Sequence, residues 1–153
     1  MAIISWIFNR IGDVVSGKPS ELSLGKSLSQ FQERKNRLQA ANMALKKKFD
    51  AQYHDLIRHI ANLTTTEEIS PKDYRQIEKL CSGFLNMPRE GIETEKNKAM
   101  EAARIGKDRA TNVNIMLLAG TALEIAENNA QIKEIDKNLE ELRHELSRIK
   151  RVP

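Results

Sequence analysis

The sequence is poor in the residues that build loops, disulfides and thick globular cores. Its 153 residues include one cysteine, four prolines and seven glycines, and only 5% of them are aromatic. The single cysteine, Cys81, excludes an intramolecular disulfide, and so few turn-forming residues exclude a loop-rich β fold. Long helices are the architecture that remains.

Long apolar runs are lacking as well. No stretch reaches the roughly 18 apolar residues that a membrane-spanning helix needs. The short apolar start of the sequence also lacks the basic region of a cleaved secretory signal. We therefore expect a cytoplasmic protein without a transmembrane span, which meets a membrane only at its periphery.

The residue types of catalytic and metal sites form no recognisable pattern. His54 and His59 are five residues apart and so lie on different faces of a helix. Glu141 and His144 have the Glu-x-x-His spacing of di-iron helical bundles, but the second copy that such a site needs is missing. The glycines are scattered and form no phosphate-binding loop. The sequence therefore predicts no catalytic residue, no metal site and no cofactor, in a protein that is not an enzyme.

Residues 1–17 form the first candidate functional element. Apolar side chains recur there at helical spacing, and a linker that contains Pro19 follows at residues 18–23. The candidate contact residues of this amphipathic helix are Ile3, Ile4, Trp6, Ile7, Phe8 and Ile11. Two interpretations stay open. The helix lies in the headgroup region of an anionic membrane, or it covers an apolar stripe elsewhere in the fold.

Residues 24–153 are predicted to form one helical domain with coiled-coil segments. Leucine and phenylalanine recur over 24–63 in alternating steps of three and four, which is the heptad pattern of a coiled coil. Three polar residues, Lys35, Asn42 and Gln52, occupy the same seam. Such residues cost stability but fix the register of the paired helices.

Two further helices complete the predicted domain. Ser70 and Pro71 have the residue types of a helix start, which predicts a short helix over 71–87. The segment 92–150 contains no proline and is compatible with a single long helix.

The segment 92–150 carries three patterns. Small residues in its first half predict close packing against another helix backbone; they are Ala99, Ala103, Gly106 and Ala110. The uncharged stretch 110–123 predicts a buried helix. The clearest heptads follow and predict a seam for oligomerisation or for a partner; they comprise Ile125, Ile132, Ile135, Leu139, Leu142, Leu146 and Ile149.

A helical hairpin would leave part of this seam uncovered. If the helix 24–63 packs against the segment from residue 92 onward, it runs out of length near residue 127, because both helices rise equally per residue. We therefore expect the heptads beyond residue 127 to overhang and to meet the N-terminal helix or a second copy of the protein.

The net charge is +4, and the positive excess is concentrated in the helix 24–63. The candidate basic patch comprises Arg34, Lys35, Arg37, Lys46, Lys47 and Lys48. It is smaller than the basic face of a dedicated nucleic-acid-binding protein. A solvated helix face is the favoured interpretation, ahead of contact with anionic lipid or nucleic acid.

These patterns predict an all-α protein, an elongated helical hairpin or bundle with an N-terminal amphipathic helix. Its plan resembles that of membrane-remodelling coiled-coil proteins such as the phage-shock protein A family, in architecture rather than in any motif. The favoured hypothesis is a homo-oligomeric, non-enzymatic scaffold or structural subunit, with peripheral attachment to an anionic membrane as an option. A soluble adaptor or chaperone-like module that binds a helix of a partner protein is the alternative, and a helical nucleic-acid-binding protein ranks third.

Overall fold

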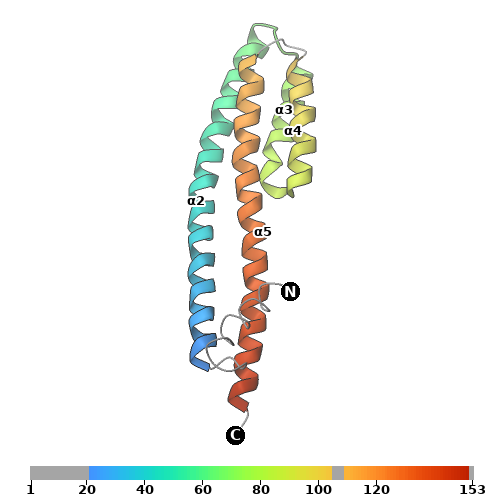
Figure 1. Cartoon of the computed structure of the whole chain (residues 1–153). Helices are drawn as coiled ribbons and strands as arrows, with labels where there is room; N and C mark the ends of the chain where they lie inside the picture. Colours follow the sequence, from blue (N-terminus) through green and yellow to red (C-terminus); the bar gives the residue numbers. More distant parts are fainter. Residues whose placement is uncertain (1–20, 105–108, 152–153) are drawn as a thin grey trace. The chain divides into compact units, whose positions relative to one another are not determined.

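The computed structural model describes residues 21–104 and 109–151, and every regular element in these two ranges is a helix. The elements are α2 (Glu21–Thr65), α3 (Pro71–Ser82), the 3-10 helix η1 (Phe84–Asn86), α4 (Arg89–Arg104) and α5 (Arg109–Arg151) (Figure 1). The predicted all-α class is confirmed. Within the described ranges, no helix has the length and apolar character that crossing a membrane requires.

Two of the predicted features lie outside these ranges. The amphipathic segment 1–17 is not described, so its contact residues Ile3, Ile4, Trp6, Ile7, Phe8 and Ile11 stay a prediction. Gly106, one of the four small residues expected to pack closely, also lies outside the described residues.

The chain divides into two compact units, which we name after the helical segments that they contain. The two-helix unit has described residues 21–40 and 129–151, and the four-helix unit comprises residues 41–128. α2 and α5 contribute to both units, whereas α3 and α4 belong to the four-helix unit alone.

The start of α3 is set by its cap, as predicted. The side-chain oxygen of Ser70 accepts a hydrogen bond from the backbone N–H of Asp73 at 3.1 Å. Pro71 occupies the first turn, where its missing N–H leaves no helical hydrogen bond unmade.

Three consecutive threonines mark the end of α2. The hydroxyls of Thr64 and Thr65 donate hydrogen bonds to backbone carbonyls one turn earlier, at 2.9 and 3.1 Å. The backbone then adopts a left-handed conformation at Glu67, with φ at 63°. This conformation ends the helix, because it redirects the following N–H groups to carbonyls of the last turn.

The core of the four-helix unit combines side chains from all of its helices. Its largest fully buried residues are Leu56, Ile60, Ile77, Phe84, Ile92, Ile115, Leu118 and Ile125. Each such side chain contributes about 1.5–3 kcal/mol when it leaves water. α3 has only 12 residues, so this packing rather than intrinsic propensity stabilises it.

Two of the small residues predicted to pack closely belong to this core. Ala99 and Ala103 on α4 are 0% exposed. Ala110 is exposed on α5, so the prediction of close packing is wrong there. α4 ends at Arg104 and α5 begins at Arg109, and the helical phase of Ala99 and Ala103 therefore does not continue to Ala110.

The segment 92–150, considered as one helix because it lacks proline, is divided between α4 and α5. Within the four-helix unit, α4 and the first half of α5 run in opposite directions (Figure 1). As a result α5, and not α4, is the long helix that pairs with α2.

In the two-helix unit, the C-terminal heptads are covered within the chain. Leu139 and Leu142 on α5 are at most 1% exposed, and Leu24 on α2 is 0% exposed. Lys35 of α2 lies 2.6 Å from Asp136 of α5, so the two helices pack side by side. The expectation that the heptads beyond residue 127 overhang is therefore wrong, because α2 pairs with α5 and not with the segment that begins at residue 92.

Candidate interaction surfaces

Every polar residue noted in the seam of α2 has a polar partner on α5. The three pairs are Lys35 with Asp136 at 2.6 Å, Asn42 with Asn128 at 3.0 Å and Gln52 with Thr121 at 2.7 Å. The first pair belongs to the two-helix unit and the other two to the four-helix unit. Since each partner lies in the same chain, these pairs fix the register between α2 and α5.

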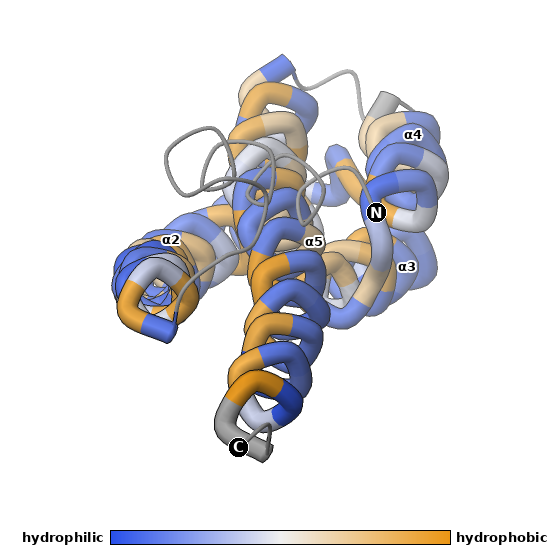
Figure 2. The backbone as a smooth tube through the Cα atoms, turned by 60° about the horizontal axis from the view of Figure 1, so that its bottom comes forward, coloured by the Kyte–Doolittle hydropathy of each residue, from blue (hydrophilic) through white to orange (hydrophobic). Residues whose placement is uncertain are grey.

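The predicted oligomer seam of α5 is largely occupied by this pairing. Hydropathy alternates along the helix, with an apolar and a polar side (Figure 2). Ile125, Ile135, Leu139 and Leu142 are buried, whereas Ile132, Leu146 and Ile149 are half-buried. The buried members are inaccessible to a second molecule in this conformation.

The candidate basic patch is split between the two units. In the two-helix unit, Arg34 donates to Gln131 at 3.5 Å, Lys35 pairs with Asp136, and Arg37 pairs with Glu33. Lys46, Lys47 and Lys48 are exposed in the four-helix unit. Half of the predicted positive charges are thus engaged with neighbouring side chains, which favours a solvated helix face over an anion-binding surface.

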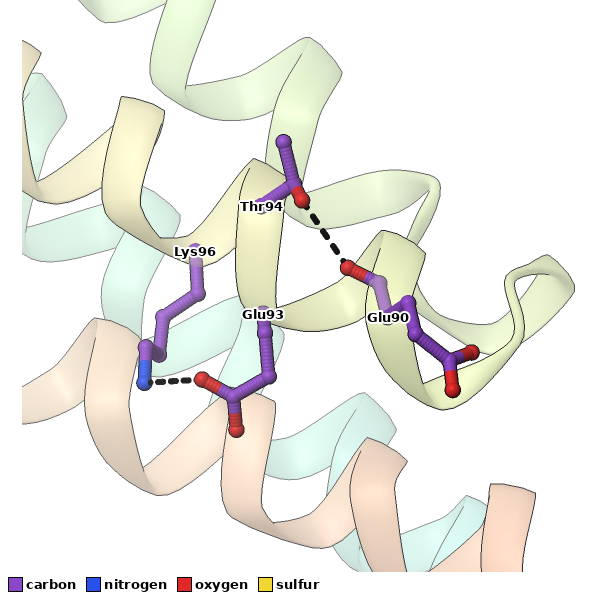
Figure 3. Close-up of polar contacts among 4 residues, drawn as sticks. All are labelled: Glu90, Glu93, Thr94 and Lys96. Atoms are coloured by element: carbon purple, nitrogen blue, oxygen red, sulfur yellow. Dashed lines mark hydrogen bonds and ion pairs between the residues drawn. The ribbon is translucent and has the colours of Figure 1, made fainter.

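α4 carries a local polar network near its start (Figure 3). The ammonium group of Lys96 lies 2.7 Å from the carboxylate of Glu93, and the hydroxyl of Thr94 donates to the backbone carbonyl of Glu90 at 3.0 Å. The hydrogen bond from Lys96, together with its charge, lowers the pKa of Glu93. Exposed pairs at this spacing stabilise a helix only slightly, so the network is a local support of α4.

Two shallow grooves are present on the described surface. One, of about 410 Å³, lies between α3 and α4 and is lined by Asp73, Gln76, Asn97, Lys98, Glu101 and Ala102. The other, of about 650 Å³, lies in the two-helix unit and is lined by Glu21, Leu22, Gly25, Lys26, Ser29 and Leu146. The described residues contain no group of three His, Cys, Asp or Glu arranged to hold a metal ion.

Cys81 is enclosed in the core of the four-helix unit. Its side chain is 0% exposed, and burial raises the pKa of its thiol to about 12. Because the thiolate is the nucleophilic form of cysteine, this residue is unreactive at neutral pH.

Three of the four large apolar residues that are exposed in the described part of the four-helix unit lie on the first half of α5, and the fourth is Met43 on α2. Val113, Met116 and Leu117 are each 53% exposed, and their spacing of three and four residues places them on one face of the helix. Ala110 is exposed on the same face. Contiguous apolar surface of this kind is typical of protein interaction sites.

Sequence reasoning missed this surface, because it predicted that the whole stretch 110–123 is buried. The prediction is correct for Ile115, Leu118 and Ala119, which belong to the core, but wrong for the face that carries Val113 and Leu117. The available signal was that apolar residues occupy both sides of the helix there, more than one packed neighbour can cover.

Comparison with known proteins gives no match: no protein-family model, no curated protein and no solved structure is similar to the chain.

Proposed function

We propose that this protein is a non-enzymatic helical scaffold or structural subunit that self-associates through exposed helix surface. The observation that carries the proposal is the apolar face of α5, where Val113, Met116 and Leu117 are each half-exposed. A solvent-exposed face of this composition is stabilised when another apolar surface covers it. The buried, unreactive Cys81 and the shallow grooves support an assembly role over catalysis.

Peripheral attachment to an anionic membrane is the second part of the proposal. It rests on the sequence of residues 1–17, where Trp6, Ile7 and Phe8 supply an apolar face and Arg10 a neighbouring positive charge. With only Arg10 and Lys18 as basic residues near it, this attachment is weak and reversible, because each basic residue adds about 1 kcal/mol near an anionic surface.

Light scattering at increasing protein concentration, with and without anionic liposomes, tests both parts. We expect the mean mass of the protein to rise with its concentration. At low salt we also expect the protein to bind the liposomes and to increase their scattering mass. A chain that stays monomeric at all concentrations and gains mass only with a partner protein would instead be the soluble adaptor.

Deleting residues 1–17 separates the two roles considered for the N-terminal segment. We expect the deletion to abolish liposome binding and to leave the melting temperature unchanged, because the segment places its apolar face in lipid and not in the fold. Phe8→Glu in the full chain should reproduce the loss of liposome binding. A fall of many degrees in melting temperature would contradict the membrane role, since it would mean that the segment covers the folded core.

A further inference from the structure

The outward face of α5 in the four-helix unit is one continuous stripe. Seven residues at steps of one, three or four share it: Arg109, Ala110, Val113, Met116, Leu117, Gly120 and Glu124. At about 100° per residue they span an arc of roughly 120°. Six of them are exposed and Gly120 is partly exposed, so the whole stripe is open to another molecule.

The charges of this stripe lie only at its two ends. No charged residue occurs from residue 110 to residue 123, whereas Arg109 begins the stripe and Glu124 ends it. Both end residues are exposed, and neither forms an ion pair with any residue that the structure describes. An apolar centre with opposite charges at its ends is complementary to its own reversed copy.

Gly120 adds a second, independent observation. Glycine in the middle of a helix costs stability relative to alanine, but it allows another helix backbone to approach closely. A Cβ atom added at Gly120 would meet nothing within 4 Å in the chain. Gly120 therefore leaves room on this face for the backbone of a helix from outside the chain.

We propose that α5 pairs antiparallel with α5 of a second copy through this stripe, around a two-fold axis between Met116 and Leu117. The proposal rests on the proposed self-association and names its surface and geometry. The axis places Met116 against Leu117 of the partner copy, Val113 over Gly120, and Arg109 beside Glu124. Each contact occurs twice, as an isologous interface requires.

The charge pattern selects this geometry over the alternatives. A parallel pairing would place Arg109 against Arg109 and Glu124 against Glu124, and like charges in contact are unfavourable. An anionic membrane would attract Arg109 but repel Glu124, so these charges give it no net attraction, whereas a second copy pairs both of them. The stripe from Ala110 to Gly120 is about 15 Å long at 1.5 Å per residue, so the interface is small and the dimer dissociates at roughly 10 µM to 1 mM.

Sedimentation equilibrium of the full chain tests the surface first. We expect a monomer–dimer equilibrium for the wild type and a monomer for Leu117→Asp, which places two carboxylates next to the axis. Met43→Asp is the matched control, because Met43 is 67% exposed on α2 and is not part of the stripe. This variant should leave the equilibrium unchanged. All substituted side chains are exposed, so the melting temperature of the monomer should not change.

Charge exchange then tests the pairing. Arg109→Glu alone and Glu124→Arg alone should each weaken dimerisation by roughly 3- to 30-fold at low salt. Each variant places two like charges next to each other at both ends of the interface. The double variant carries both charges exchanged and should regain the wild-type dissociation constant. No recovery in the double variant would overturn the pairing of Arg109 with Glu124.

Engineered disulfides distinguish the two helix directions. Antiparallel pairing brings Val113 next to Gly120 of the other copy, so the variant Val113→Cys, Gly120→Cys should oxidise to a covalent dimer. Val113→Cys alone should not form a covalent dimer, because in the antiparallel pair position 113 of one copy is seven residues away from position 113 of the other. Cys81 contributes no background, since its thiol is buried. Covalent dimers from the single variant would show parallel pairing and refute the geometry.

Failure of this inference is distinguishable from failure of the proposed function. If the wild type forms an oligomer and Leu117→Asp and the charge-exchange variants form an oligomer of the same mass, the α5 interface is contradicted. Self-association itself is not contradicted by that result. A wild type that stays monomeric up to about 1 mM would contradict both. Binding to anionic liposomes that is lost in Leu117→Asp would assign the stripe to the membrane and overturn the second copy as its occupant.

Discussion

At the scale of single residues, Cys81 ties proton binding to folding. Its thiol pKa rises from 9.0 to about 12 because the folded chain buries it. A group whose pKa is raised by folding contributes stability that is fully present below its unfolded pKa and is lost as the pH rises toward the folded value. The affected window is therefore pH 9 to about 12. Tyr53 and Tyr74 act in the same direction above pH 10, since burial raises the pKa of both.

This linkage predicts a steep alkaline loss of stability. Above pH 9 the free energy of unfolding should fall by up to about 1.4 kcal/mol per pH unit through Cys81 alone. Urea unfolding at pH 8, 9.5 and 10.5 measures the slope. Cys81→Ala should be less stable at pH 8, because it leaves a small cavity, yet show a shallower slope. If the two proteins lose stability in parallel, the thiol is not the group that titrates.

At the scale of helices, the polar pairs between α2 and α5 matter more for register than for stability. Asn42 is 5% exposed and its amide oxygen accepts a hydrogen bond from Asn128 at 3.0 Å. A buried amide without a partner costs about 1–3 kcal/mol, whereas replacing both members by apolar residues is often neutral or stabilising. The pair is thus a constraint on the alignment of α2 with α5, as are the pairs of Lys35 with Asp136 and of Gln52 with Thr121.

A double-mutant cycle tests this interpretation. Asn42→Leu should lower the free energy of unfolding by about 1–2 kcal/mol, because it leaves the amide of Asn128 without its partner. Adding Asn128→Leu should restore or exceed the wild-type value. Asn36→Leu, at an exposed position of α2, is the control and should change stability by less than about 0.5 kcal/mol. Equal losses in the single and double variants would show that the hydrogen bond is not the relevant interaction.

The same scale shows what the sequence could and could not predict. Ser70 and Pro71 predicted the start of α3 because a cap acts through neighbouring residues. The division of the segment 92–150 was left open, because the absence of proline was compatible with one helix and Gly106 was interpreted as a packing residue. Once that reversal is missed, α2 is paired with the wrong segment. The expected overhang follows from this error, whereas the buried face at Val113 was predicted from the absence of charge in the stretch 110–123.

At the scale of the whole molecule, the two units differ in how much of each helix is covered. In the four-helix unit, α5 buries Ile115 and Leu118 in a core that also receives α3 and α4. In the two-helix unit only α2 and α5 are described, whereas α3 and α4 belong to the four-helix unit alone. Fewer packed helices around each described helix lower its local stability.

Native-state hydrogen exchange should therefore separate the two units. We expect the backbone amides of residues 21–40 and 129–151 to exchange at least roughly tenfold faster than those of Leu56, Ile77 and Ile115, because the two-helix unit opens without global unfolding. Mass spectrometry of peptic peptides resolves this difference. Equal protection along the full length of α5 would mean that the two units unfold as one.

The course of α2 and α5 through both units also constrains the order of folding. In the unfolded chain, residues 40 and 129 are separated by the entire segment 41–128, and closing a loop of roughly 90 residues costs on the order of 4 kcal/mol in chain entropy. Folding of the four-helix unit removes that cost, since it already brings Asn42 and Asn128 into contact. In the two-helix unit, α2 and α5 then pair progressively, starting near Asn42 and Asn128 and ending at Glu21 and Arg151. In a chain whose four-helix unit misfolds, this pairing has to overcome the full entropic cost of loop closure.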